Sequence, residues 1–180
     1  MKGKIVIADY DPQWPQLYEQ AKHRILQATN GLIIAIEHIG STAVPGLAAK
    51  PIIDIMPGVK QLADADACIE GLVRMGYTYV PIYEDALPDR RYFSLHLREH
   101  KGYHIHMVEV GGDFWKRHLL FRDYLHAHPE AAQAYAQIKR KLAPQFTDTN
   151  DYASAKTEFI TGMVAKAQVW KDSLIQREGG

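Results

Sequence analysis

The sequence predicts an α+β protein, with a mixed β-sheet core in about residues 1–112 and helices over about residues 113–176. Two observations indicate this class. Short apolar or alternating runs separated by turn residues fill the first part, whereas apolar residues at helical spacing dominate the second. Strands followed by helices are typical of α+β proteins. No repeat, low-complexity tract or long linker interrupts residues 1–180, so we expect a single domain.

The strands are predicted from β-branched or alternating runs that are bounded by Gly, Pro or charged residues. The first run is short, so we expect an edge strand there. A loop is expected at residues 81–90 and a turn at residues 99–102. The predicted strands cover residues 4–7, 32–39, 51–56, 77–80, 91–97 and 103–110.

Two helices are predicted among these strands from apolar stripes at helical spacing. Asp11 is expected to cap the first helix, with Pro12 in its first position, and Asn30-Gly31 ends it. The second helix covers residues 61–75 and stops at Gly76.

The C-terminal part is expected to be helical throughout. Asp113 is the predicted cap of its first helix, and the His128-Pro129 step separates this helix from one at residues 130–142. A last long helix is expected to begin at Thr149 or Asn150 and to fray at residues 178–180.

Composition narrows the classes of function. Lys plus Arg number 21 and Asp plus Glu number 21, so no strong global field draws the chain to nucleic acid or to a membrane surface. Cys68 is the one cysteine, which excludes an intramolecular disulfide and a cysteine-based zinc site and favours a core thiol. No apolar run reaches the roughly 20 residues of a membrane span, and no signal-like segment follows Met1. We expect a cytoplasmic protein.

The segment between the two central strands carries the strongest indication of a binding site. One apolar run leads into Gly40-Ser41, and the next carries a single acid, Asp54. A Gly-Ser turn that opens a helical turn offers backbone N–H groups and a hydroxyl to an anion. An acid among apolar residues is costly to bury unless something pairs with it. Together they indicate a phosphate-sized turn beside a functional carboxylate.

These residues resemble a known family. Gly40-Ser41, twelve residues and then Asp54-Ile55 are similar to the nucleotidyltransferase signature, and the string HIGSTAVPGLAAKPIIDI resembles the GrpB family, small bacterial proteins of that superfamily. The resemblance implies a nucleotidyltransferase-like mixed sheet with a helical C-terminal part. It spans most of the chain, since it continues through His104-Ile105-His106, residues 121–125, residues 128–130, Tyr135 and Lys139 to near Tyr152 and Lys156.

One position departs from the superfamily signature, because Met56 stands where a second carboxylate is expected. The resemblance implies that the neighbouring strand supplies a further metal ligand, a position that His104 or His106 would fill. Positions i and i+2 share a face of a strand, so both histidines can face Asp54, whereas Glu109 lies on the opposite face. One carboxylate and two imidazoles suit Zn or Mn better than Mg, which prefers oxygen.

We therefore predict a divalent metal ion at Asp54, His104 and His106. The alternative is a pair of hydrogen-bonded histidines on a half-buried strand. Two other classes of phosphate-cleaving enzyme are disfavoured. A histidine-triad nucleotide hydrolase needs a third histidine where Val108 stands, and a two-histidine phosphoesterase needs two His-x-Ser/Thr motifs, which the sequence lacks.

Further residues are predicted to hold the ligand. Ser41 and Thr42 would bind a phosphate or cap a helix, and Lys50 would neutralise a phosphate or remain solvated. Arg91 is favoured over its basic neighbours because it opens a predicted strand, the alternative being a solvated face. The predicted substrate-binding set is Gly40, Ser41, Thr42, Lys50, Arg91, Arg122, Tyr135 and Lys139.

Three of these lie on the C-terminal helices and rest on the resemblance. Tyr135 and Lys139 share a helix face, on which a base would stack and a phosphate would bind. Arg122 stands next to Asp123, so a structural ion pair is its alternative role.

Two functions compete. In the first, a nucleotidyltransferase-like enzyme binds a nucleoside phosphate in a metal-assisted pocket at the Gly-Ser turn. Asp54 holds the metal or acts as base, and Ser41 and Lys50 assist at the phosphates. In the second, favoured by Met56, the chain is a catalytically inactive nucleotide- or metal-binding module or scaffold. The expected partner is a small-molecule nucleotide or a nucleotide-containing cofactor, since family members fused to dephospho-coenzyme A kinase hint at that context.

Overall fold

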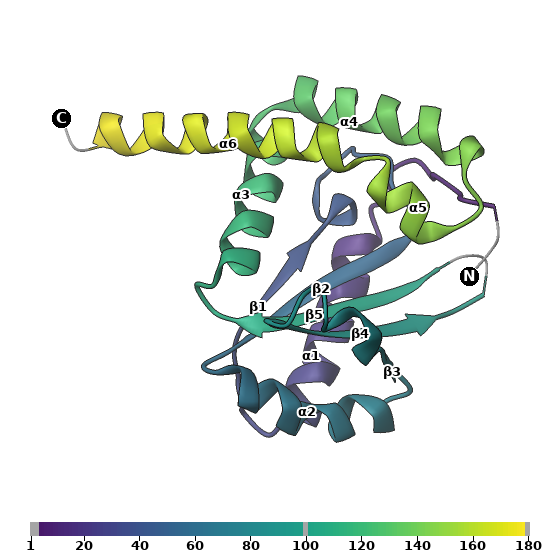
Figure 1. Cartoon of the computed structure of the whole chain (residues 1–180), viewed down its shortest axis with the longest axis vertical. Helices are drawn as coiled ribbons and strands as arrows, with labels where there is room; N and C mark the ends of the chain where they lie inside the picture. Colours follow the sequence, from purple (N-terminus) through teal and green to yellow (C-terminus); the bar gives the residue numbers. More distant parts are fainter. Residues whose placement is uncertain (1–3, 99–100, 179–180) are drawn as a thin grey trace.

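The computed structural model describes residues 4–98 and 101–178 (Figure 1). Within these residues the strands form one five-stranded mixed sheet in the order β1-β2-β5-β4-β3. The parallel pair is β2 with β5, and the other neighbours are antiparallel. The α+β class with a helical C-terminal part is confirmed. The strands are β1 (Ile33–Ile39), β2 (Ile52–Val59), β3 (Thr78–Tyr79), β4 (Arg90–His96) and β5 (Gly102–Glu109).

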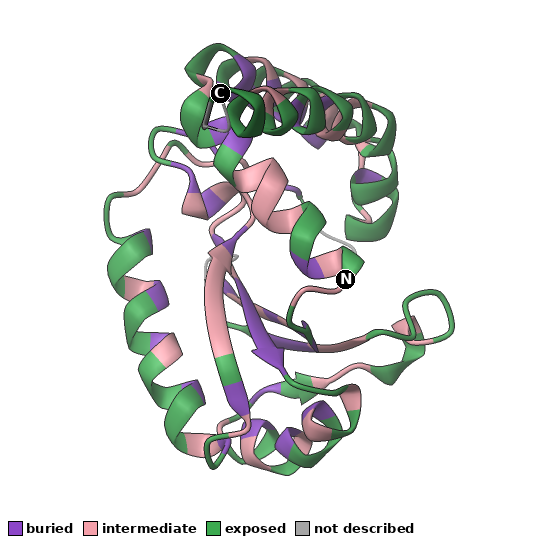
Figure 2. Ribbon diagram, turned by 90° about the vertical axis from the view of Figure 1, so that its left-hand side faces the viewer, coloured by how far each residue is buried: buried purple, intermediate pink, exposed green. Residues whose placement is uncertain are grey.

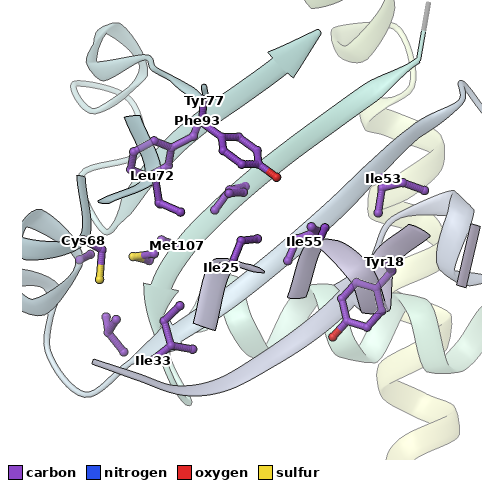
Figure 3. Close-up of a cluster of buried hydrophobic side chains, with 14 of the residues drawn as sticks. Tyr18, Ile25, Ile33, Ile53, Ile55, Cys68, Leu72, Tyr77, Phe93 and Met107 are labelled. Carbon is purple, nitrogen blue, oxygen red and sulfur yellow. The ribbon is translucent and has the colours of Figure 1, made fainter. Parts of the chain in front are cut away.

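Two helices, α1 (Trp14–Ala28) and α2 (Leu62–Arg74), cover one face of the sheet (Figure 1). The main core fills the space between them and the strands, and Cys68 lies in it, as expected of a core thiol. Exposed residues cover the outer sides of the helices, and buried residues face the sheet (Figure 2). The labelled core residues in Figure 3 are Tyr18, Ile25, Ile33, Ile53, Ile55, Cys68, Leu72, Tyr77, Phe93 and Met107.

The C-terminal helices lie on the other side of the sheet (Figure 1). Trp115 of α3 packs on Met56 and Val108, whose side chains leave the sheet away from α1 and α2. Buried residues of helices 113–127, 129–142 and 157–178 pack with Val44, Leu47 and Ala48 of the chain between β1 and β2, and Tyr152 of the short helix 149–154 packs with Ile5 and Ala143. The helices are α3 (Asp113–Ala127), α4 (Pro129–Leu142), α5 (Thr149–Ser154) and α6 (Thr157–Glu178).

The alternation of side chains along each strand decides which residues can meet. Ile53 and Ile55 enter the core against α1 and α2, so Asp54 faces the C-terminal helices. The register pairs Asp54 with His104 across β2 and β5. It pairs Tyr92 with His106 across β4 and β5. A row of polar and aromatic side chains therefore shares the face opposite the main core.

Two expectations about the extent of strands and helices were wrong. Residues 4–7 form no strand, because Ile5 is buried with Ala143 and Tyr152 and Ile7 packs against the cluster of Val44, Leu47 and Ala48. An isolated bridge follows, between Ala8 and Ala49. The expected last long helix is interrupted after Ser154 and resumes at Thr157.

Caps also differ from the expectation. Gln13, not Asp11, is the N-cap of α1, and the Asp11 carboxylate accepts from the Gln13 N–H at 2.9 Å. Gly112 precedes α3, so Asp113 lies in its first turn, and Asp148 caps α5 through the N–H groups of Asn150 and Asp151.

Parts of two expectations, the turn at residues 99–102 and the frayed end at residues 178–180, lie outside the described residues. Among the helices that the structure does describe, none combines the length and apolar character needed to cross a membrane.

Candidate functional site

Asp54, His104 and His106 converge at the centre of the sheet, and their potential ligand atoms all lie within 4.8 Å of one another. The Asp54 Oδ1 atom is 3.4 Å from Nδ1 of His104 and 3.4 Å from Nε2 of His106. Parallel pairing of β2 and β5 creates this cluster, because it sets Asp54 beside His104 and brings the next side chain of the same face within reach. Their role as metal ligands stays a prediction.

Gly40 brings the backbone against the Asp54 carboxylate. Its φ of 70° and ψ of −171° lie in a region that is essentially restricted to glycine. A Cβ atom at this position would lie 2.5 Å from Oδ2 of Asp54. The single 3₁₀ turn Ser41–Ala43 follows directly, so Ser41 begins a helical turn beside the carboxylate.

Thr42 anchors this turn and is 1% exposed. Its Oγ1 donates to the Ile52 carbonyl at 3.2 Å and accepts from Nε2 of His38, 3.0 Å away. The His38 ring stacks on Tyr18, and burial lowers the pKa of His38 to about 4, so the ring is neutral. The Thr42 hydroxyl is engaged within the protein, and the predicted phosphate contact through it is not supported.

The geometry of the cluster fits a transition metal in one respect. With zinc–ligand bonds of about 2.0–2.2 Å, tetrahedral ligands lie roughly 3.4 Å apart, which matches the two distances from Asp54 Oδ1. The same distances are long for hydrogen bonds. Met56 is fully buried against Trp115, so it supplies neither a ligand nor space for a second ion.

Arg90 opposes metal binding by His106. Its Nη1 lies 3.2 Å from Nδ1 of His106, and a guanidinium only donates. Nδ1 therefore accepts, which leaves the proton of the neutral ring on Nε2, the atom that faces Asp54. Metal-ligating histidines have the reverse arrangement. Asp54 and His104 fit a metal as they stand, whereas His106 fits once Arg90 moves away from its Nδ1.

Protonation states follow from burial and from these contacts. Burial lowers the pKa of His106, and the Arg90 charge lowers it further, although Asp54 opposes both. Burial disfavours the ionised form of Asp54, but hydrogen bonds with His104 and His106 outweigh burial and hold the pKa of Asp54 below its usual range. The site therefore holds a carboxylate beside neutral His106.

Arg91 does not face the site, which corrects the prediction. It lies on the opposite face and forms an ion pair with Asp66 at 2.5 Å and another with Glu84 at 3.5 Å. Arg90 occupies the position that was expected of Arg91. Its guanidinium lies 5.0 Å from the Tyr92 ring centroid and 5.7 Å from the Phe114 ring centroid. Its buried Nε has no hydrogen-bond partner among the described residues.

Two more predicted ligand residues have partners within the protein. Arg122 bonds Glu37 at 2.7 Å and Asp123 at 2.8 Å, so its structural alternative is favoured. The Tyr135 ring stacks on Phe159, with ring centroids 5.7 Å apart, and so does not offer a free face for a base. Its hydroxyl instead reaches the Ser41 side chain, a hydrogen bond that partly offsets the rise in the pKa of Tyr135 caused by burial.

Lysines complete the surroundings of Asp54. Lys50 is predicted and lies within electrostatic reach of the carboxylate, which partly offsets the lowering of the Lys50 pKa by burial. Lys139 is buried on α4. Lys156, absent from the predicted set, also interacts with Asp54. The one signal for Lys156 in the sequence is its place at the end of the family resemblance.

Comparisons with known proteins agree with the fold. The family model described as GrpB protein matches residues 4–166. The UPF0157 protein YqkA of Bacillus subtilis is 40% identical over 171 residues, which cover 94% of this chain and 49% of that protein, so the chain spans about half of its length. The crystal structure of conserved protein GrpB from Enterococcus faecalis superimposes with a TM-score of 0.81 at 32% identity, and the match covers 92% of this chain and 99% of that one.

A more distant likeness concerns the fold alone. The structure of a cytoplasmic RNA terminal U-transferase matches with a TM-score of 0.50 at 9% identity and covers 74% of this chain and 42% of that chain.

Proposed function

The chain belongs to the GrpB family, and from this premise we propose that it binds a nucleoside phosphate in a metal-assisted pocket at the Gly40-Ser41 turn. One observation carries the proposal. The turn approaches Oδ2 of the Asp54 carboxylate so closely that only glycine fits, and two imidazoles lie beside Oδ1 of the same carboxylate. A structural turn does not need this arrangement, whereas a phosphate held beside a cation does.

Each residue of the pocket has a distinct task in this proposal. Gly40 lets the backbone approach, and Ser41 offers an N–H to a phosphate oxygen, whereas its hydroxyl must first leave Tyr135. Asp54 and His104 would hold the divalent ion, which when bound would polarise a phosphate as a Lewis acid. His106 donates to Asp54 or joins the ligands, and Lys50 adds positive charge. The fold likeness to a terminal U-transferase supports a nucleotidyltransferase-like framework and does not identify the substrate.

Binding is favoured over rapid nucleotidyl transfer. Met56 leaves the site one acid short of the set that clamps two metal ions, and its burial under Trp115 excludes a nearby substitute. Asp54 is also a poor general base, because the hydrogen bonds that lower its pKa stabilise the carboxylate. A single-metal transferase remains the second candidate, favoured by the acid and two histidines that converge at the site.

A thermal-shift series tests the proposal, with ATP, GTP, CTP and coenzyme A precursors in Mg²⁺, Mn²⁺ or Zn²⁺. A ligand at a hundred times its dissociation constant stabilises the fold by about 2.7 kcal/mol, which raises the melting temperature by roughly 5–11 °C for this chain length. We expect such a rise with a nucleotide and a divalent ion, its loss in Asp54→Asn, and its retention in Asp172→Asn on the exposed side of α6.

The absence of a shift with every ligand would refute nucleotide binding. A pyrophosphate-release assay beside it separates the two candidates, because fast release by the wild-type protein would establish the enzyme and exclude the inactive module.

A further inference from the structure

Three lysines from separate segments are linked through their electrostatic interactions, and two of them, Lys50 and Lys156, also interact with Asp54. Lys50 lies two residues before the start of β2, Lys139 lies on α4 and Lys156 lies between α5 and α6. They form an electrostatic chain, since Lys139 interacts with Lys156, Lys156 with Lys50, and both Lys50 and Lys156 with Asp54. Among the described residues none of the three lysines takes part in an ion pair within 4.0 Å. Positive charge therefore exceeds negative charge here.

Lys139 is an unusual residue to bury, with 2% of its surface exposed. Its ammonium donates to the Ala48 carbonyl and lies 4.5 Å from the Tyr135 ring centroid. An ammonium has three donors, so one carbonyl and a ring leave it under-satisfied. A fully buried lysine without a carboxylate is costly to keep, which points to an absent anionic partner.

Lys156 repeats the pattern from another element. Its ammonium lies 4.1 Å from the Tyr152 ring centroid, and no hydrogen bond from it is found among the described residues. This lysine lies in the break between α5 and α6 and interacts with Asp54. Two independent elements thus deliver ammonium groups to the same region.

The lowered pKa values of Lys139 and Lys156 agree with the lack of a nearby anionic partner among the residues that the structure describes. Burial, then the charges of Lys156 and Arg140, lower the pKa of Lys139 to about 7. Burial, then the charge of Lys50, lowers the pKa of Lys156 to about 8, although Asp54 opposes the change. The other titratable groups in contact are the phenols of Tyr135 and Tyr152, whose raised pKa values keep them neutral. A bound anion would raise both lysine pKa values and draw protons from solution.

We propose that Lys50, Lys139 and Lys156 form a receptor for a chain of two or more phosphates. The proposal rests on the function proposed above in one respect, because it takes the bound phosphates to be those of a nucleotide. A single phosphate carries about two negative charges, fewer than three ammonium groups. A di- or triphosphate carries more negative charge and matches the three ammonium groups better.

Calorimetric titration with inorganic triphosphate and with orthophosphate, without metal, tests the receptor. We expect triphosphate to bind at least about tenfold more tightly than orthophosphate. Lys139→Met and Lys156→Met should each weaken triphosphate binding about ten- to a hundredfold, because each removes charge-assisted hydrogen bonds. Lys166→Met, at an exposed position of α6, is the control and should bind as the wild type does. If Lys139→Met does not fold, Lys156→Met carries the test alone.

Proton uptake supplies a readout that general charge attraction would not give. Titrations at pH 8 in HEPES and in Tris should reveal uptake by the wild type, smaller uptake by Lys139→Met, and little uptake by the wild type at pH 6, where both lysines are already charged. The receptor would be refuted if Lys139→Met and Lys156→Met bound triphosphate with the same affinity as the control Lys166→Met. It would also be refuted if the wild-type protein did not bind triphosphate.

The outcomes separate this inference from the proposed function. Lysine-dependent binding of triphosphate without any binding of nucleotides would uphold the receptor and reject the nucleotide. Nucleotide binding that is insensitive to Lys139→Met and Lys156→Met would reject the receptor and uphold the nucleotide.

Discussion

Replacement of Gly40 by alanine tests the contact that defines the site. The residue has φ 70° and ψ −171°, a conformation that costs a residue with a side chain about 1–3 kcal/mol. The new Cβ would lie 2.5 Å from Oδ2 of Asp54 and 3.1 Å from its Cβ and Cγ. Such overpacking costs about 1–3 kcal/mol more.

The two contributions predict a loss of roughly 2–6 kcal/mol in the free energy of unfolding. For a chain of this length, that corresponds to a fall of roughly 4–24 °C in melting temperature. Urea denaturation followed by circular dichroism measures the difference. Gly46→Ala is the matched control, because Gly46 also has a positive φ of 76° but no atom within 4 Å of the added Cβ.

A double-mutant cycle isolates the contact with the carboxylate. Asp54→Ala removes the two atoms of the carboxyl group nearest the new methyl group, so Gly40→Ala should cost less in that background than in the wild type. If the cost is the same in both backgrounds, or if Gly40→Ala costs no more than Gly46→Ala, the close approach of the turn to Asp54 does not exist in solution.

Three further predictions follow from the contacts of the site. Asp54→Asn should lower the free energy of unfolding at pH 7, because the contacts with His104 and His106 that hold the pKa of Asp54 below its usual range stabilise the folded carboxylate and an amide is a weaker acceptor; an unchanged melting temperature would show that these contacts do not stabilise the fold. Arg90→Met should tighten zinc binding and, with zinc bound, leave the proton of His106 on Nδ1, which the ¹⁵N shifts of the labelled ring report; zinc affinity and a zinc-bound tautomer equal to those of the wild type would refute the role of Arg90. The pKa of His118 is lowered to about 4 by burial, so its contribution to stability should be present above pH 6.5 and lost as the pH falls from 6.5 towards 4, a loss of roughly 3 kcal/mol that His118→Phe should abolish.

Much of the sheet could be predicted from the sequence because alternation along a strand has a fixed period. That period put Asp54 and Met56 on one face and separated Glu109 from the two histidines, before any register was known. The choice of Arg91 over Arg90 was wrong although the same alternation argued against it. Arg91 shares a face with Phe93 and Leu95, which pack in the main core, whereas Arg90 pairs with Val108 and lies on the face of His106.

Burial at the C-terminal side could not be predicted in the same way. The helix pattern placed Lys139 on a face with Tyr135 but did not show that Ala48 and Phe159 cover that face. The interruption before Thr157 has neither proline nor glycine, so tertiary packing rather than propensity ends α5. The segment at residues 4–7 has the composition of a strand, and its burial beneath the C-terminal helices competes with strand pairing.

The single parallel pair in the sheet has a consequence for how the protein folds. Neighbouring parallel strands must be joined by a crossover, and here the segment that joins β2 to β5 contains α2, β3 and β4. Asp54 and His106 are 52 positions apart, so their meeting requires the closure of a long loop, which is slow compared with helix formation. Recovery of ligand binding during refolding should therefore lag behind the return of the helical circular dichroism signal. The rate of that recovery would report when β5 docks against β2.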